Sequence, residues 1–285
     1  MKRTRLAAIA TLGGALALGA ATAALVVQGG LYDVGATRQH TQTVHTLLEH
    51  AMKQSVRRQA RGIETPPLDA PALLARGAAC FRDHCVQCHG APGVAPGPAS
   101  MGMQPLPGPL LDAARRWHER EIYWITRHGI RMSGMPAWGM RLGDADLWSV
   151  VGFIAELPRL SPADYAGRME AVRGADCALP SGDSEAAPGP GAMPPRERAR
   201  AALRQYACVA CHAIPGVTGS RAQVGPPLAG MARRTLIAGR LANTPDNLVR
   251  WIRAPHTVKP GTAMPDLGVT EEHARLIAAY LATLH

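Results

Sequence analysis

The sequence predicts an all-α protein in which an N-terminal transmembrane helix precedes two tandem helical modules. The first observation is an uncharged stretch of 22 residues, from Leu6 to Val27, near the start of the 285-residue chain. The second is a pentapeptide that occurs twice in matching surroundings, as CVQCH at 85–89 and as CVACH at 208–212. The third is an aromatic content of only 4%, with two Phe, which leaves little large apolar material for two cores. Some other group must therefore help to fill each module.

Residues 1–30 are expected to form a membrane anchor. As a helix, the stretch from Leu6 to Val27 is about 33 Å long at about 1.5 Å per residue, which is enough to cross a bilayer. A cleaved signal peptide is the alternative, since the small residues ATA at 21–23 resemble a cleavage site. We favour a retained anchor because apolar residues continue to Val27 and Tyr32 follows at the expected interface. The basic residues of MKRTR place the N-terminus inside, so that the rest of the chain is exported.

Residues 31–69 are expected to hold an amphipathic helix and a connector. Between Thr43 and Gln59, apolar or small residues recur at three- and four-residue spacing, which predicts one face of a helix. These residues are Val44, Leu47, Leu48, Ala51, Met52, Ser55 and Val56. Basic residues near the end suit the helix dipole, and Pro66 and Pro67 close the segment. The sequence leaves three surfaces open for this face, namely the first module, a partner protein or the membrane.

Two modules are expected at 70–160 and 196–285, joined by a linker at 161–195 that is rich in Gly, Pro and small residues. We call them module 1 and module 2. Both follow one plan: a short helix, the pentapeptide, a long loop rich in Gly and Pro, a Met-Pro pair and a closing helix. The expected helices cover residues 71–82 and 143–157 in module 1, and 195–206 and 270–284 in module 2. The chain therefore contains one kind of module twice.

The pentapeptide carries the chemistry. A CxxC pair alone suits a redox disulfide, half of a zinc site or a set of iron–sulfur ligands. The His that follows in both copies favours covalent haem, because two thiols three positions apart can add to the haem vinyl groups while the imidazole binds the iron. Zinc would need a second pair of ligands near each motif, and a thioredoxin-like site would need a helix after it. Since the sequence offers neither, we expect two covalently attached haem c groups.

With these motifs the chain resembles class I c-type cytochromes, and in layout a membrane-anchored dihaem cytochrome c. The resemblance covers roughly residues 70–160 and 196–285, and it implies cytochrome c-like helical modules that bind haem. It also implies that a Met-Pro pair late in each module supplies the sixth iron ligand, which points to Met135 and Met264. In module 1 four other residues compete with Met135, namely Met101, Met103, Met132 and Met140. The implied sites are haem attachment at Cys85, Cys88, Cys208 and Cys211, and iron ligation by His89, Met135, His212 and Met264.

The resemblance assigns further roles around these sites. GPPL at 225–228 looks like the family's Gly-Pro-x-Leu, whose Pro carbonyl accepts the N–H of the iron-binding histidine, so Pro226 would orient His212. No such motif is visible in module 1, where Pro105 and Pro107 are the candidates. Gly77 in module 1 and Ala199 in module 2 look like the small residues against which the closing helices pack. The aromatic residues expected to pack on those helices are Trp148, Phe153 and Tyr280.

Two of the six cysteines, Cys80 and Cys177, lie outside the pentapeptides. In an oxidising compartment spare cysteines often pair, and a disulfide here would tie module 1 to the linker. Buried free thiols are the alternative, because the sequence does not give the distance between the two residues.

The net charge and the expected iron ligation limit the classes of function that the sequence allows. The formal net charge of +10 comes from scattered Arg without interleaved aromatic residues, so no nucleic-acid partner is expected. His/Met coordination fills both axial positions of an iron, so no small-molecule substrate is expected either. The chain is therefore predicted to be an electron carrier and not an enzyme.

The expected carrier is a periplasm-facing dihaem protein, held in the bacterial inner membrane by its N-terminal helix. It would pass electrons from a respiratory quinol-oxidising complex or a dehydrogenase to a terminal oxidase, and its basic modules would steer it to acidic docking surfaces. One alternative is a cytochrome subunit of a larger dehydrogenase or oxidase complex. The other is a dihaem peroxidase, in which one haem would lose its Met ligand and open a site for peroxide. The Met-Pro ligand loop in both modules argues against this alternative.

Overall fold

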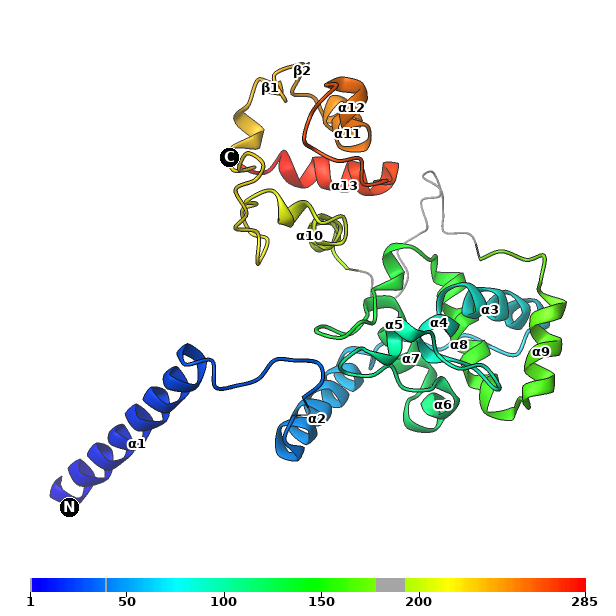
Figure 1. Ribbon diagram of the computed structural model, residues 1–285, viewed down its shortest axis with the longest axis horizontal. Coiled ribbons are helices and arrows are strands. Elements are labelled where there is room, and N and C mark those ends of the chain that lie inside the picture. Colours follow the sequence, from blue (N-terminus) through cyan, green and yellow to red (C-terminus); the bar gives the residue numbers. More distant parts are fainter. Residues whose placement is uncertain (1, 39, 178–192) are drawn as a thin grey trace.

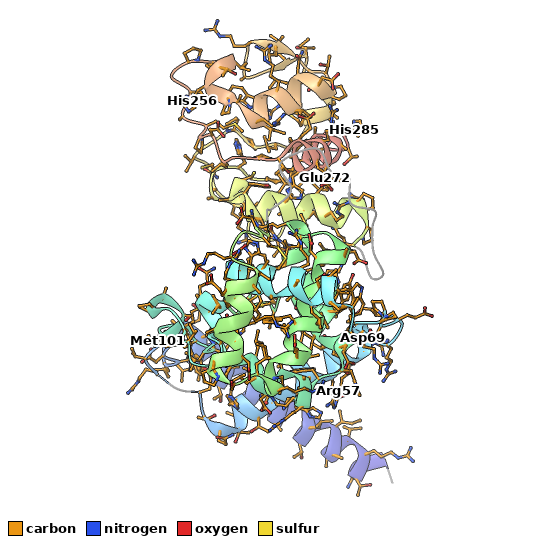
Figure 2. The ribbon with its side chains drawn as sticks, turned by 90° about the vertical axis from the view of Figure 1, so that its right-hand side faces the viewer. Arg57, Asp69, Met101, His256, Glu272 and His285 are labelled. Carbon is orange, nitrogen blue, oxygen red and sulfur yellow. A yellow bond between two sulfur atoms is a disulfide. The ribbon has the colours of Figure 1, made fainter. Side chains whose placement is uncertain are left out.

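The computed structural model describes residues 2–38, 40–177 and 193–285 and is mostly helical (Figure 1). The Gly- and Pro-rich core of the expected linker, at 178–192, lies outside the described residues. The chain begins with the long helix α1 (Lys2–Gln28), which projects away from both modules in Figures 1 and 2. Among the described residues it is the one helix long and apolar enough to cross a membrane, and none of its apolar window is buried. The predicted helix at the anchor is therefore present.

Helix α2 (Gln42–Gln59) packs on module 1. It begins after Thr41, whose hydroxyl accepts a hydrogen bond from the N–H of Val44 at 3.5 Å. Val56 and the following Ala60 are buried, and Ala60 belongs to the core of module 1. One face of the predicted amphipathic helix thus covers the first module, next to helix α7.

Module 1 is built around the crossing of its first and closing helices. At this crossing a Cβ added to Gly77 would lie 1.9 Å from the carbonyl oxygen of Ser149, so only glycine permits the close approach. Helix α7 was not predicted, and it lies in the segment expected to be a loop. The helices of module 1 are α3 (Pro71–His84), α4 (Val86–His89), α5 (Pro98–Met101), α6 (Ala113–Arg116), α7 (Glu119–His128) and α8 (Asp144–Glu156).

The aromatic residues of the closing helices pack as predicted. In module 1 the ring of Trp148 stacks on Tyr123 with centroids 4.1 Å apart, and Phe153 packs on Phe81 at 5.4 Å. In module 2 the hydroxyl of Tyr280 donates a hydrogen bond of 2.8 Å to the carbonyl oxygen of Pro215. These contacts fix each closing helix against the rest of its module.

Module 2 repeats the crossing of a first and a closing helix. Ala199, on the first helix, is 1% exposed, in keeping with the small residue predicted there. Its helices are α10 (Pro195–Gln205), α11 (Pro245–Arg253), α12 (Pro255–Val258) and α13 (Glu271–Leu281). A short antiparallel pair, β1 (Leu236–Ile237) and β2 (Leu241–Ala242), precedes α11, with Leu236 opposite Ala242. Neither α11 nor the hairpin was predicted, because the segment resembles a long loop in sequence.

The two modules touch through the loop that follows Met135. Met140, in a 3-10 turn at 138–140, is 6% exposed and belongs to the hydrophobic core of module 2. Ala137 packs against the same cluster. In Figures 1 and 2 helix α10 lies next to module 1. The loop that carries the expected ligand of module 1 is therefore also its contact with module 2.

Helix α9 (Pro162–Ala171) lies in the segment that the sequence assigns to the linker. Ser161 caps it, accepting a hydrogen bond from the N–H of Asp164 at 3.1 Å. Tyr165 is buried beside Phe153, with ring centroids 6.5 Å apart. Structurally, the first part of the expected linker thus belongs to the core of module 1.

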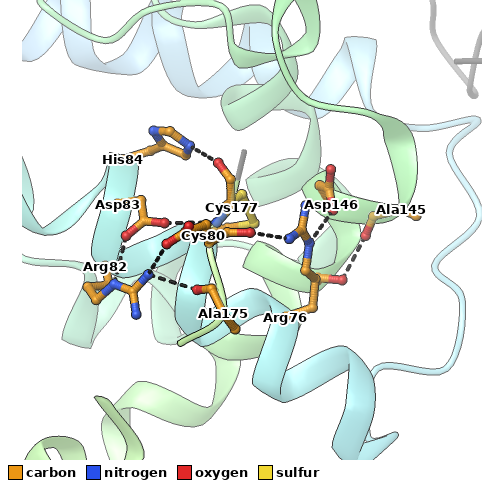
Figure 3. Close-up of a disulfide and its surroundings, with 11 residues drawn as sticks. Arg76, Cys80, Arg82, Asp83, His84, Ala145, Asp146, Ala175 and Cys177 are labelled. Atoms are coloured by element: carbon orange, nitrogen blue, oxygen red, sulfur yellow. Dashed lines mark hydrogen bonds and ion pairs between the residues drawn. A yellow bond between two sulfur atoms is a disulfide. The ribbon is translucent and has the colours of Figure 1, made fainter. Parts of the chain in front are cut away.

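Cys80 and Cys177 form a disulfide, so the pairing weighed from the sequence is confirmed and free thiols are excluded here (Figure 3). The bond joins helix α3 to the segment after α9. Polar contacts surround it: Arg82 donates to the carbonyl oxygen of Ala175 at 2.8 Å, and Asp83 accepts from the N–H of Cys177 at 2.9 Å. Together these contacts hold residues 172–177 against helix α3 and form what we call the clamp. Helix α3 ends directly before the first pentapeptide.

Replacing Cys80 and Cys177 together with serine should weaken module 1 selectively. The disulfide spans 97 residues of sequence, so its loss should lower the free energy of unfolding of module 1 by about 2–5 kcal/mol. Chemical denaturation followed by tryptophan fluorescence measures this, because four of the five Trp lie in module 1. An unchanged transition in module 1, or an equal loss in module 2, would contradict the assignment of the clamp to module 1.

Candidate haem sites

The first pentapeptide continues directly from helix α3. Cys85 caps that helix, and the next residues form the single turn α4, so the motif lies in a continuous helical path. Cys85 and Cys88 are free thiols, the first buried and the second half-buried. Burial, together with the neighbouring Cys88, raises the pKa of Cys85 to about 12. A thiol in such an apolar position suits a thioether to a buried group.

His89 is oriented by a main-chain carbonyl. Its Nδ1 lies 2.7 Å from the carbonyl oxygen of Gly108. A donating Nδ1–H leaves Nε2 with a free lone pair, the form in which imidazole binds a metal. Burial lowers the pKa of His89, which favours the neutral imidazole. The expectation that Pro105 or Pro107 supplies this carbonyl is wrong, because any residue can supply a main-chain oxygen and Gly108 has the right position.

A cavity of about 490 Å³ opens beside the first pentapeptide. It brings Cys85, Cys88 and His89 together with Met135, although Met135 is 46 positions further along the chain than His89. Most of the remaining wall is apolar, and it includes Met52, Met103, Leu106, Leu110, Trp117, Ile122, Ile125, Ile130, Trp138, Val150 and Ile154. An apolar cavity with paired thiols, an imidazole oriented by a main-chain carbonyl and methionine thioethers fits a covalently attached haem.

The Met135 loop is held by local contacts. The N–H of Met135 donates to the hydroxyl of Ser133 at 3.2 Å. Gly129, with φ +66°, lies so close that an added Cβ would be 2.6 Å from the carbonyl oxygen of Met135. Trp138 lines the same cavity and packs on His84 with ring centroids 5.0 Å apart. The competing Met132 is 91% exposed.

The histidine of the second pentapeptide, His212, is oriented by a main-chain carbonyl in the same way as His89. The Nδ1 of His212 lies 2.7 Å from the carbonyl oxygen of Pro226, so the predicted hydrogen bond is present. Gly225 packs on the imidazole, since an added Cβ would lie 2.5 Å from Cε1 of His212. Cys208 and Cys211 are half-buried free thiols, and burial raises the pKa of Cys208.

The second Met-Pro loop repeats the first in its hydrogen bonding. The N–H of Met264 donates to the hydroxyl of Thr262 at 3.3 Å, as Met135 does to Ser133. A hydroxyl residue two positions before each Met is thus a further common feature of the repeat. It is visible in the sequence as SGMP and TAMP, although our predictions did not use it.

Zinc and iron–sulfur sites are the two alternatives for a CxxC pair that need further protein ligands. Among residues 2–38, 40–177 and 193–285, no group of three or more His, Cys, Asp or Glu side chains could hold a metal ion. A zinc or iron–sulfur site needs such a group, whereas a haem iron needs one side chain on each face.

Comparison with known families agrees with this chemistry. Residues 72–154 match the family described as cytochrome c oxidase, cbb3-type, subunit III, and residues 197–285 match the family described as cytochrome c. Both modules are thus cytochrome c domains. Each of the two domains implies one covalently attached haem c, so the chain is a dihaem cytochrome.

Individual relatives resemble parts of this dihaem cytochrome. Cytochrome c oxidase subunit 2 of Alkalihalophilus pseudofirmus is 38% identical over 86 residues, covering 30% of this chain and 24% of that protein. The same subunit of Bacillus sp. is 36% identical over 87 residues, covering 29% and 24%. The cbb3-type cytochrome c oxidase subunit CcoP of Cereibacter sphaeroides is 27% identical over 139 residues, covering 40% and 46%. The chain thus spans between about a quarter and about half of these curated relatives. No solved structure matches it.

Proposed function

We propose that this dihaem cytochrome is an electron-carrying subunit associated with a terminal oxidase. It would accept electrons from a quinol-oxidising complex or a dehydrogenase and pass them to the oxidase. The observation that carries the proposal is the match of residues 72–154 to the cbb3-type oxidase subunit III family. The partial similarity to the CcoP subunit supports it.

Four residues in each module are proposed to hold one haem. In module 1 these are Cys85 and Cys88 as thioether positions, with His89 and Met135 as iron ligands, and in module 2 they are Cys208, Cys211, His212 and Met264. Haem c supplies the one-electron chemistry of its iron. The hydrogen bonds from the two histidines to main-chain carbonyls fix the imidazole orientation and tautomer. Met135 and Met264 would each supply a thioether as the second iron ligand, which suits electron transfer better than peroxide chemistry.

The same chain is proposed to sit in the bacterial inner membrane with both modules in the periplasm. Helix α1 has the length and composition of a membrane span, and its basic N-terminus favours the inside. The Cys80–Cys177 disulfide supports export, because disulfides persist in oxidising compartments.

The contact between the modules supports electron transfer within one chain. Met140 and Ala137 follow the Met135 loop and pack into the core of module 2. The segment that follows Met135 therefore contacts the other module. We propose that electrons pass between the two haems across this contact between the modules.

Purification of the full chain from its membranes in mild detergent tests the association. We expect the dihaem cytochrome to co-migrate with further subunits, and the fraction to consume oxygen in a cyanide-sensitive way when reduced donor is supplied. A protein that migrates alone and transfers electrons only to soluble acceptors would contradict the role as an oxidase subunit. A resting high-spin spectrum with rapid peroxide turnover would contradict the carrier function itself.

A further inference from the structure

Helix α2 carries a second apolar stripe that the described residues leave largely exposed, although Val44 within it is half-buried. Leu47 is 67% exposed and Leu48 is 54% exposed. Together with Val44 and Ala51 they follow the three- and four-residue spacing of one helix face. Arg58 lies seven positions after Ala51, and therefore on the same face, at the end of the stripe. We call Val44, Leu47, Leu48 and Ala51 the outer stripe.

An adjoining side of α2 packs on module 1, while the two leucines of the outer stripe stay exposed. Val56 is 1% exposed and Ala60 is not exposed at all. Met52, on this same inner side, lines the cavity of module 1 beside Cys88 and His89. Helix α2 therefore separates that cavity from whatever the outer stripe contacts.

The tether to α1 limits what the stripe can reach. Helix α1 ends at Gln28 and α2 begins at Gln42, so only residues 29–41 connect them. Thirteen residues span at most about 45 Å when fully extended. The half of α2 that carries the outer stripe is also the half nearest to α1 in the chain. A helix held this close to a membrane span meets the bilayer surface more often than any soluble partner.

The charges on α2 suit an anionic lipid surface. Arg57, Arg58 and Arg61 are exposed, and no acidic side chain among the described residues forms an ion pair with them. Lys53 pairs with Glu49 at 2.7 Å and is not available in the same way. Exposed leucines with free arginines at their flank are typical of helices that lie in the membrane interface.

We propose that α2 lies on the bilayer surface with its outer stripe in the headgroup region. The inference rests on the proposed role of α1 as a retained anchor. Since α1 supplies the attachment, a stripe of four residues has only to orient module 1, not to bind the membrane alone. The orientation brings the cavity of module 1 within about one helix diameter, roughly 10 Å, of the membrane surface. Module 1 would thus face membrane-embedded redox partners, while module 2 would remain further out.

Photo-crosslinking in bilayer nanodiscs of phosphatidylethanolamine and phosphatidylglycerol tests the proposal. A benzophenone amino acid replaces Leu48 in the full, haem-loaded chain, and mass spectrometry identifies the adducts after illumination. We expect lipid adducts at Leu48 to exceed severalfold those at Thr46, which is exposed on the same helix but lies outside the stripe. The same probe at Leu236, an exposed leucine of module 2, serves as a second control. The double change Leu47→Ser and Leu48→Ser should lower severalfold the lipid adducts of a probe at Ala51.

A further probe at Leu16 in α1 separates this inference from the anchor on which it rests. Lipid adducts at Leu16 without an excess at Leu48 would overturn the α2 proposal and leave the anchor intact. An absence of adducts at both positions would overturn the anchor as well. Cross-links from Leu48 to another polypeptide in native membranes, in place of lipid, would assign the stripe to a protein partner and overturn the proposal. The haem absorption spectrum checks that each variant is folded.

Discussion

Replacing Cys208 and Cys211 together with alanine is expected to remove one haem and to unfold module 2. The aromatic content is thin, so the haem itself supplies a large part of each module's interior. Intact mass should fall by one haem, the haem stain on a denaturing gel should fall by about half, and helical circular dichroism should decrease.

The corresponding change in module 1, Cys85→Ala with Cys88→Ala, should also remove one haem but leave more structure behind. Module 1 keeps the Cys80–Cys177 disulfide, the clamp around Arg82 and the stacked Tyr123 and Trp148. We therefore expect a smaller loss of helical signal there than in module 2.

The double change Cys80→Ser and Cys177→Ser is the matched control, since it also removes two cysteines and should retain both haems. Two haems remaining in either pentapeptide variant would rule out the proposed attachment.

Replacing Met264 with histidine should lower the reduction potential of the second haem while its iron stays six-coordinate. A thioether favours the reduced iron and an imidazole the oxidised iron, so the shift should be roughly a few tenths of a volt. The same change at Met135 should act on the first haem. Redox titration followed by absorption measures both potentials, and the near-infrared band of Met-ligated ferric iron should be lost for the altered haem only.

Met132→His provides the matched control for the first haem. Met132 lies three positions before Met135, but it is 91% exposed, and the structure places Met135 in the cavity wall. We expect Met132→His to leave both potentials unchanged. A shift on changing Met132 or Met103, with none on changing Met135, would move the sixth ligand to that residue.

The sequence by itself determined the features whose chemistry is local. A thiol pair and the histidine after it lie within five consecutive residues, so the motif is visible before any folding. The same holds for the Met-Pro pairs, for the apolar run of α1 and for the short helices around Gly77 and Ala199. His89 and Met135 line one cavity, and their roles as iron ligands stay a prediction.

Only the tertiary structure decided the features that depend on distance between remote segments. Cys80 and Cys177 are 97 positions apart, and no pattern in the chain gives their separation in space. The carbonyl that orients His89 belongs to Gly108, and a main-chain oxygen leaves no trace in the residue type. The amphipathic pattern of α2 predicted a helix with a single apolar face. In the structure that face divides into a side packed on module 1 and the exposed outer stripe. Packing on module 1 buried Val56 and Ala60 and left Leu47 and Leu48 exposed. Helix periodicity defines the faces of a helix, but only the neighbouring surface determines which face is covered.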